Sequence, residues 1–206
     1  MEISVCGPAD VALLDRHIAS PGTLSFRARR FARQQRGEST CLLAWLEGRP
    51  VGHVEMRWLG CDAPAVRTAR PGCPEINGLG VWPEELRSRG IGTALVRAAE
   101  GLARERGIAT VGMGVAKDNP RAAALYARLG YQPLIDYLDR WSYEGPDGAL
   151  RDCVDACAFL VKDLVRPALR NGRKPRCNEH PPSRQTRNDH ADTRKVAAFH
   201  QQRHSP

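Results

Sequence analysis

The chain has 206 residues, 42% of them hydrophobic, which is enough for one domain with a proper core, or for one domain with an appendage. No apolar run approaches the ~18 residues that a membrane span needs, and the first residues lack the basic and apolar regions of a secretory signal. We therefore expect a cytoplasmic protein that does not associate with membranes.

The net charge of +8 is concentrated at one end of the chain. Residues 166–206 contain ten Lys or Arg and three Asp or Glu, a net charge of +7, so the rest of the chain is close to neutral. This segment has one aromatic residue and few aliphatic ones, too little to offset the entropy of ordering. We expect a folded domain over 1–164 and a disordered basic tail over 165–206. Nucleic-acid binding is a weak expectation, carried by the tail alone, since no aromatic residues interleave with its charges.

The seven cysteines are odd in number and form no CxxC pair. We therefore expect no metal site and no disulfide framework. Cys153 and Cys157, four residues apart in a strand, are interpreted as buried structural thiols.

The first half of the domain alternates between helical and extended patterns. We expect helices over 10–19 and 23–35, two strands within 40–59, a Pro/Gly loop over 60–74 and a strand over 75–81.

The second half opens with a glycine-rich turn and a helix whose predicted apolar stripe is Ile91, Leu95, Ala98 and Leu102. Gly107 is placed to end that helix, and Asn119 with Pro120 is a typical start for another, ending at Gly130. We expect a strand over 108–116 and two long final strands within 131–145 and 149–164. The pattern as a whole predicts one α/β (α+β) domain, with a mixed central sheet of about six or seven strands and about four flanking helices.

The glycine-rich turn has the chemistry of an anion site. Leu79 and Val81 alternate with glycines, so a ligand can lie close to this strand, and Gly90 and Gly92 expose backbone N–H groups at a helix N-terminus. The turn lacks the Lys of a nucleoside-triphosphate loop and the third glycine of a dinucleotide fingerprint. From these residues alone, phosphate binding and a purely structural strand-to-helix connection are both open.

Two longer motifs resemble the GNAT superfamily of acyl-CoA-dependent N-acetyltransferases. The stretch "LGVWPEELRSRGIGTAL" is similar to its motif [RQ]-x-x-G-x-[GA] through Arg87, Gly90 and Gly92, with one extra residue, Glu84 or Glu85, before Arg87. The stretch "NPRAAALYARLGYQP" is similar to a second motif, N-x-x-A-x-x-L-Y-x-x-x-G-[FY], which begins at Asn119 and includes Tyr126. The resemblance covers roughly residues 1–164.

This resemblance implies acetyl-CoA as the acyl donor, with no metal. It implies that the strand contacts the pantetheine arm and that the turn contacts the pyrophosphate. Asn119, at the start of the helix that ends at Gly130, would also contact the cofactor. The implied cofactor-binding residues are Leu79, Gly80, Val81, Arg87, Ser88, Arg89, Gly90, Ile91, Gly92, Thr93 and Asn119.

The resemblance also implies the catalytic groups. Tyr126 would protonate the leaving thiolate, and Glu75 would act as general base for the amine. Asn77, His53 and Glu55 are weaker candidates, and the last two could instead face water. A packing role for Tyr126 and a solvated carboxylate for Glu75 are the structural alternatives.

The expected reaction is attack of a primary amine, on a small molecule or peptide, on the thioester of acetyl-CoA. The segments 20–36 and 59–74, where the resemblance implies that the acceptor enters, are rich in Arg. That composition disfavours a polycationic aminoglycoside, and an amine carrying a carboxylate, or a peptide amine, fits no worse. The alternative function is a catalytically weak acyl-CoA-binding module. The resemblance makes a homodimer the default assembly.

Overall fold

The computed structural model describes residues 1–17, 26–145 and 147–164. The predicted tail, Cys177 and the first turn of the helix expected over 23–35 lie outside the described residues. The elements are β1 (Glu2–Val5), α1 (Pro8–His17), α2 (Phe26–Gln35), β2 (Ser39–Leu46), β3 (Arg49–Arg57), α3 (Pro64–Ala69), β4 (Glu75–Val81), a 3₁₀ turn (Glu84–Leu86), α4 (Ile91–Glu105), β5 (Thr110–Ala116), α5 (Pro120–Arg128), β6 (Gln132–Glu144) and β7 (Leu150–Asp163).

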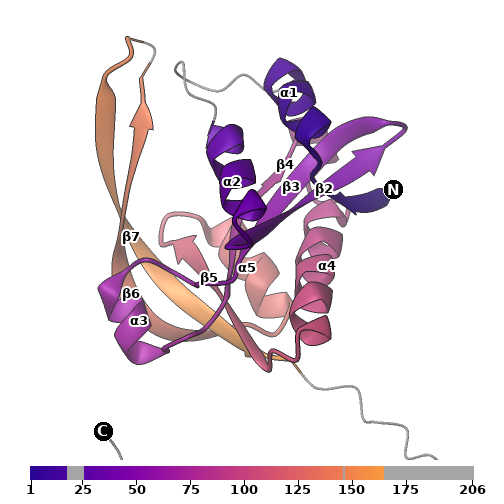
Figure 1. Cartoon of the computed structure of the whole chain (residues 1–206). Helices are drawn as coiled ribbons and strands as arrows, with labels where there is room; N and C mark the ends of the chain where they lie inside the picture. Colours follow the sequence, from indigo (N-terminus) through magenta and orange to yellow (C-terminus); the bar gives the residue numbers. More distant parts are fainter. Residues whose placement is uncertain (18–25, 146, 165–206) are drawn as a thin grey trace, which may run out of the picture. The chain divides into compact units, whose positions relative to one another are not determined.

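The seven strands form one mixed sheet in the order β1-β2-β3-β4-β5-β7-β6 (Figure 1). Neighbouring strands are antiparallel except β4 and β5, which are parallel. The mixed sheet with flanking helices confirms the predicted fold class.

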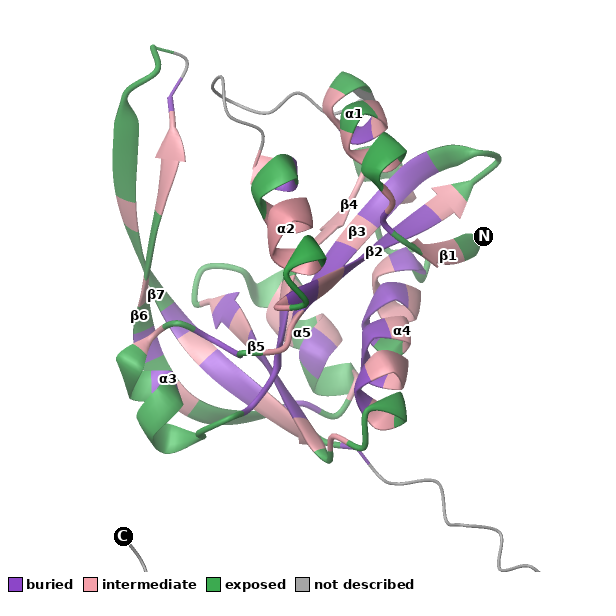
Figure 2. Cartoon of the chain, viewed as in Figure 1, coloured by how far each residue is buried: buried purple, intermediate pink, exposed green. Residues whose placement is uncertain are grey.

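Helices cover both faces of the sheet, as consecutive residues of β2 show. Leu42 belongs to the core under α4 and α5, whereas Leu43 packs with Leu14 of α1 under the N-terminal helices. Because successive side chains of a strand point to opposite faces, both neighbours are buried. Figure 2 shows the buried residues concentrated in the central strands and on the sheet-facing side of α4.

The apolar stripe of α4 packs on β2, β3 and β4. Leu95, Val96, Ala99 and Ala103 are fully buried there, while the predicted stripe residues Ala98 and Leu102 flank them. Helical spacing therefore identified the buried face but set it about one residue off its centre.

Two elements were not predicted. β1 is a four-residue edge strand paired with β2. α3 lies inside the stretch expected to be a loop, with Pro64 in its first turn, where a proline costs no hydrogen bond. The expectation of an irregular 60–74 segment was therefore wrong for its centre.

Candidate active site

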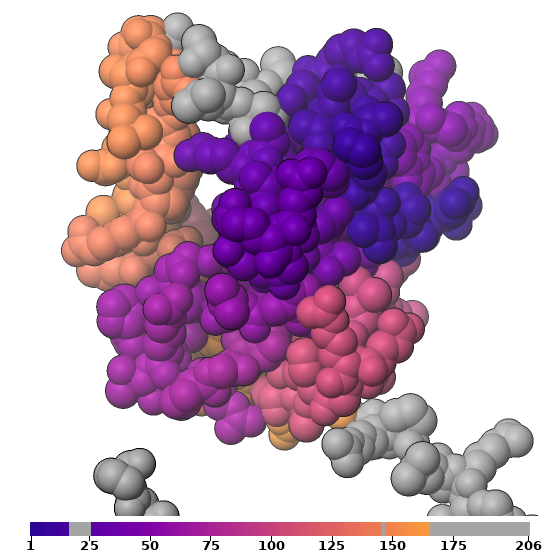
Figure 3. Space-filling view, viewed as in Figure 1, coloured from indigo at the N-terminus to yellow at the C-terminus, as the bar shows by residue number. Residues whose placement is uncertain are grey.

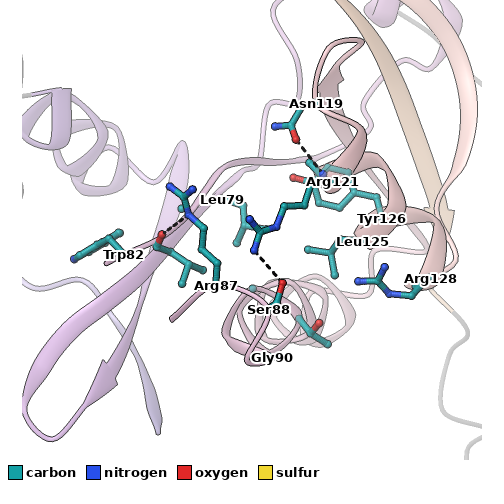
Figure 4. Close-up of a pocket in the computed structure, with 15 residues that line it drawn as sticks. Leu79, Trp82, Arg87, Ser88, Gly90, Asn119, Arg121, Leu125, Tyr126 and Arg128 are labelled. Atoms are coloured by element: carbon teal, nitrogen blue, oxygen red, sulfur yellow. Dashed lines mark hydrogen bonds between the residues drawn. The ribbon is translucent and has the colours of Figure 1, made fainter. Parts of the chain in front are cut away.

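A cleft of about 660 Å³ opens where β4 and β5 separate. The two strands share a single register pair, Glu75 with Gly112, and the Gly112 amide donates to the carbonyl of Pro74 at 2.8 Å. Beyond that pair, the C-terminal part of β4 lines the cleft together with the N-terminus of α4 and one side of α5 (Figure 4). The lining residues are Leu79, Gly80, Val81, Trp82, Arg87, Ser88, Gly90, Gly92, Thr93, Asn119, Arg121, Ala122, Leu125, Tyr126 and Arg128.

A β-bulge in β4 decides which of its side chains face the cleft. His53 of β3 pairs with Gly80 while Glu55 pairs with Asn77, so β4 contains one extra residue between these pairs. Gly78 has a φ of +59°, which glycine adopts without strain. The bulge places Leu79 and Val81 against the core under α4, together with Ile76. Strict alternation would have placed them on the opposite face.

The N-terminus of α4 presents unpaired donors at the mouth of the cleft. Gly90 is the N-cap at a φ of +88°, and no side chain caps the helix. The first intrahelical bond runs from the Ala94 amide to the Gly90 carbonyl at 3.0 Å. The three amides between them, at positions 91 to 93, have no acceptor among the described residues, so they can bind an anion with the helix dipole in support.

Arginine side chains add positive charge to this end of the cleft. Arg87 donates from Nε to the Val81 carbonyl at 3.3 Å and pairs with Glu84. Arg121 donates from Nη2 to Ser88 Oγ at 2.9 Å, which links α5 to the glycine-rich turn (Figure 4). Arg128, about two helical turns after Arg121, also lines the cleft. The extra residue predicted before Arg87 falls in the 3₁₀ turn, which ends immediately before this arginine.

Asn119 and Tyr126 enter the cleft from α5. Asn119 Oδ1 accepts a hydrogen bond from the Ala122 amide at 3.0 Å, so this side chain caps the helix. Tyr126 lines the cleft and is only 8% exposed, and burial raises the pKa of its phenol. The hydroxyl therefore stays protonated at neutral pH and can donate a proton.

Glu75 lies at the vertex of the separation between β4 and β5 but is not among the residues that line the cleft. Its carboxylate is buried and pairs with Arg57 Nη1 at 3.0 Å, and Arg57 also binds Asp62. Burial raises the pKa of Glu75, against the opposing effect of Arg57. The alternative of a solvated carboxylate is therefore wrong.

His53 and Glu55 do not face water either. Burial, with Arg30 and Arg27 nearby, lowers the pKa of His53 to about 3, so this imidazole is neutral. Its ring lies 5.2 Å from that of Trp82. Glu55 is 1% exposed and receives hydrogen bonds from Arg33 at 2.8 and 3.0 Å. Both side chains point to the face under α2, which covers this polar side of β3.

Most of the predicted cofactor residues meet in one place. Only Arg89, which is exposed, and Ile91, whose side chain is in the core, do not line the cleft. Sequence reasoning missed Trp82, Arg121 and Arg128. The spacing of Arg121, Leu125 and Arg128, at i, i+4 and i+7, places them on one face of α5 and was a usable signal.

Comparison with known proteins agrees with this geometry. The family model described as "Acetyltransferase (GNAT) family" matches residues 12–131. The chain belongs to the GNAT acetyltransferase family. Within the part of this GNAT chain that the structure describes, no helix is long and apolar enough to cross a membrane, and no group of three metal-ligating side chains gathers.

This GNAT domain has a curated relative and many solved structural neighbours. An uncharacterised N-acetyltransferase from Methanocaldococcus jannaschii is 33% identical over 99 residues, 48% of this chain. The match spans only 41% of that relative's length. The ribosomal-protein-S18-alanine N-acetyltransferase from Escherichia coli matches 82% of this chain and 97% of its own, with a TM-score of 0.56 and 17% identity. An aminoglycoside 6'-N-acetyltransferase solved with coenzyme A matches 81% and 99%, with a TM-score of 0.53 and 18% identity. These two structural matches establish a shared fold.

Proposed function

We propose that this chain is an acetyl-CoA-dependent N-acetyltransferase acting on the primary amine of a small molecule or peptide. The observation that carries the proposal is the cleft along the C-terminal part of β4, which is lined by the N-terminus of α4, by three arginines and by a buried tyrosine. Family membership supports the same reaction class.

The residues at the mouth of the cleft fit the phosphates of coenzyme A. The amides at 91 to 93 would hold the pyrophosphate without a formal charge, and Arg87, Arg121 and Arg128 would add charge-assisted hydrogen bonds. A side chain at Gly90 would have to adopt a φ of +88°, so glycine suits this cradle.

The strand stretch Leu79–Val81 would hold the extended arm that follows the phosphates. Its edge toward β5 carries no ladder pair beyond Glu75 among the described residues, so an amide-containing chain can add to it as a strand would. Acetyl-CoA supplies the thioester carbonyl and the thiolate leaving group. The Val81 amide is our candidate donor to that carbonyl.

Tyr126 is our candidate for the acid that protonates the leaving thiolate. Its raised pKa keeps the phenol protonated at neutral pH, so a proton is available beside the sulfur as the thioester C–S bond breaks. Glu75 is our candidate base, acting on the protonated amine through water because its side chain does not line the cleft. Burial raises its pKa toward neutrality, which makes the carboxylate a more effective proton acceptor.

Release of free thiol from acetyl-CoA across a panel of amines tests the proposal. Tyr126→Phe should lower kcat by about 100-fold, the low end for loss of acid catalysis, while the Kd for acetyl-CoA stays within about twofold. Tyr131→Phe is the matched control, because this neighbouring buried hydroxyl binds Glu100 and lies outside the cleft. An unchanged kcat in Tyr126→Phe would remove the acid role. Binding of acetyl-CoA without turnover of any amine would favour the binding module.

A further inference from the structure

A second cavity, of about 550 Å³, lies between α2 and the distal part of the β6–β7 hairpin. Figure 3 shows it as a hollow between the orange hairpin and the violet helix. Three arginines of α2, Arg29, Arg30 and Arg33, line one side, and the aromatic residues Trp141 and Tyr143 of β6 line the other. We name this space the α2–β6 cavity.

Arg30 joins this cavity to the β4 bulge. A side chain at Gly78 would collide with the Arg30 guanidinium, so this group packs directly on the Gly78 backbone. Leu79, the next residue, lines the cofactor cleft, and consecutive α-carbons are only ~3.8 Å apart. A molecule held by Arg30 therefore lies within a few ångströms of the strand along which the acyl donor is proposed to bind.

The Arg30 guanidinium has unused donors. Its single ion pair among the described residues runs from Nε to Glu55 at 3.3 Å. Its Nη1 is buried without a hydrogen-bond partner in the described part of the chain. Nη1 itself is closed to a ligand, but the Arg30 side chain is 20% exposed, so its accessible N–H groups can donate to an oxyanion in the cavity.

The charge of the cavity also favours an anion. Arg30 and Arg33 share one carboxylate, that of Glu55, and Arg29 makes no ion pair with the residues the structure describes. With Glu144 also counted in the lining, three positive charges face two negative ones. A polycation would meet net repulsion here, whereas a carboxylate can accept paired hydrogen bonds from a guanidinium.

The opposite wall provides fixed apolar surface. Trp141 donates from Nε1 to Asp155 at 2.7 Å, which fixes the indole, yet the side chain remains 46% exposed. The Tyr143 ring lies 5.6 Å from it. Rigid aromatic surface of this kind contacts apolar groups at little entropic cost.

We propose that the acceptor of this enzyme is an amine that carries a carboxylate and an apolar group, with the carboxylate on Arg30 and the apolar group against Trp141. The inference rests on the proposed acetyl transfer, because it names the acceptor of that reaction. Free amino acids with apolar or aromatic side chains are the simplest members of this class.

Matched amines test the carboxylate directly. L-phenylalanine is compared with its amide and with 2-phenylethylamine, and L-leucine with 3-methylbutylamine, with rates corrected for the fraction of neutral amine. The acids should have kcat/KM values at least 10-fold above their partners. In Arg30→Gln this preference should fall by about 10- to 100-fold, as for loss of a charge-assisted hydrogen bond. The variant is expected to fold, because Arg33 still holds Glu55.

Arg36→Gln is the matched control, because this exposed arginine pairs with Glu38 alone among the residues that the structure describes and lies outside the cavity. It should keep the full preference for the acids. Arg29→Gln removes an exposed cavity charge and should lower the preference less than Arg30→Gln does.

Calorimetry measures binding of the same amines to the CoA-loaded protein, and so distinguishes failure of the proposed acetyl transfer from failure of the proposed acceptor. Carboxylate amines that bind without reacting would support the carboxylate site at Arg30 but overturn acetyl transfer, and with it the role of these amines as acceptors. Turnover of the decarboxylated amines within threefold of the acids would overturn the acceptor class and leave the function standing. Failure of the acids both to bind and to react would also overturn the acceptor class, as would an unchanged preference in Arg30→Gln.

Discussion

Replacing Arg57 by methionine should destabilise the domain by leaving a buried carboxylate without its partner. The Glu75 side chain is 2% exposed and Arg57 is 20% exposed. Removing one partner of a buried pair costs about 3–5 kcal/mol, mostly because the remaining charge is left in a poorly solvated site. We expect about 3 kcal/mol, the low end, since part of Arg57 reaches water. For a domain of this size that corresponds to a Tm lower by roughly 6–12 °C.

The effect should be asymmetric between the two partners. Glu75→Gln alone leaves Arg57 paired with the exposed Asp62, so it should cost less than about 1 kcal/mol. The double variant Arg57→Met/Glu75→Gln removes the stranded charge and should recover more than half of the stability lost in Arg57→Met. The loss in the double variant minus the sum of the two single losses gives the coupling energy of the pair.

The pH dependence of Arg57→Met has a definite sign. Burial raises the pKa of Glu75 in the folded protein and Arg57 opposes that rise, so the variant has the higher folded-state pKa. A folded-state pKa above the unfolded value, about 4.3, means that the folded protein binds the proton more tightly. Stability is then gained as the pH falls from neutral through the folded pKa, and lost as the pH rises. The deficit of Arg57→Met should therefore shrink between pH 7 and pH 5.

Urea denaturation of the wild type and the three variants at both pH values measures these quantities. The reasoning fails if Arg57→Met loses under 1 kcal/mol at pH 7, because Glu75 would then be well solvated. It also fails if the deficit does not shrink at pH 5, or if adding Glu75→Gln brings no recovery.

Two further changes test local structure. Asn119→Ala should lower the free energy of unfolding by about 1 kcal/mol, since it removes the N-cap of α5. A loss of acetyl-CoA affinity beyond threefold, with the free energy of unfolding unchanged, would show that Asn119 contacts the ligand instead. In Gly78→Ala the alanine must adopt a φ of +59° and its Cβ would collide with Arg30, whereas in Gly72→Ala it must adopt a φ of +66° but meets open space. Gly78→Ala should therefore cost more stability than Gly72→Ala. Equal costs, near the 1–2 kcal/mol expected for a left-handed residue, would mean that Arg30 moves freely.

The elements that sequence reasoning located best are those with local signals. The strand at Glu75–Val81 was predicted with its exact bounds, and α5 was found from Asn119 and Pro120, whose capping and backbone preferences act within a few residues. β1 was missed because four residues at a sheet edge have no distinguishing pattern. α3 was missed because prolines and glycines were interpreted as a loop, although Pro64 is compatible with a first turn.

The cofactor cleft could be predicted because its ligands are largely backbone groups that the glycine pattern reveals. The surroundings of Glu75, His53 and Glu55 could not be predicted in the same way. Their burial depends on α2 crossing β3, and on Arg57 of the same strand reaching across to β4. Likewise, the one-residue bulge at Gly78, which decides which side chains face the cleft, appears in the sequence only as one glycine among several.

The single register pair between β4 and β5 affects the width of the cleft. β1–β4 and β5–β7 are each continuous ladders, and they meet at the pair of Glu75 and Gly112 and through their shared core. At that vertex, Glu75 is clamped by Arg57, and a side chain at Gly112 would collide with the Phe159 ring. The separation of the two half-sheets therefore depends in part on residues that do not line the cleft. A change in the size of the accepted acyl group can therefore arise at the vertex, with every lining residue unaltered.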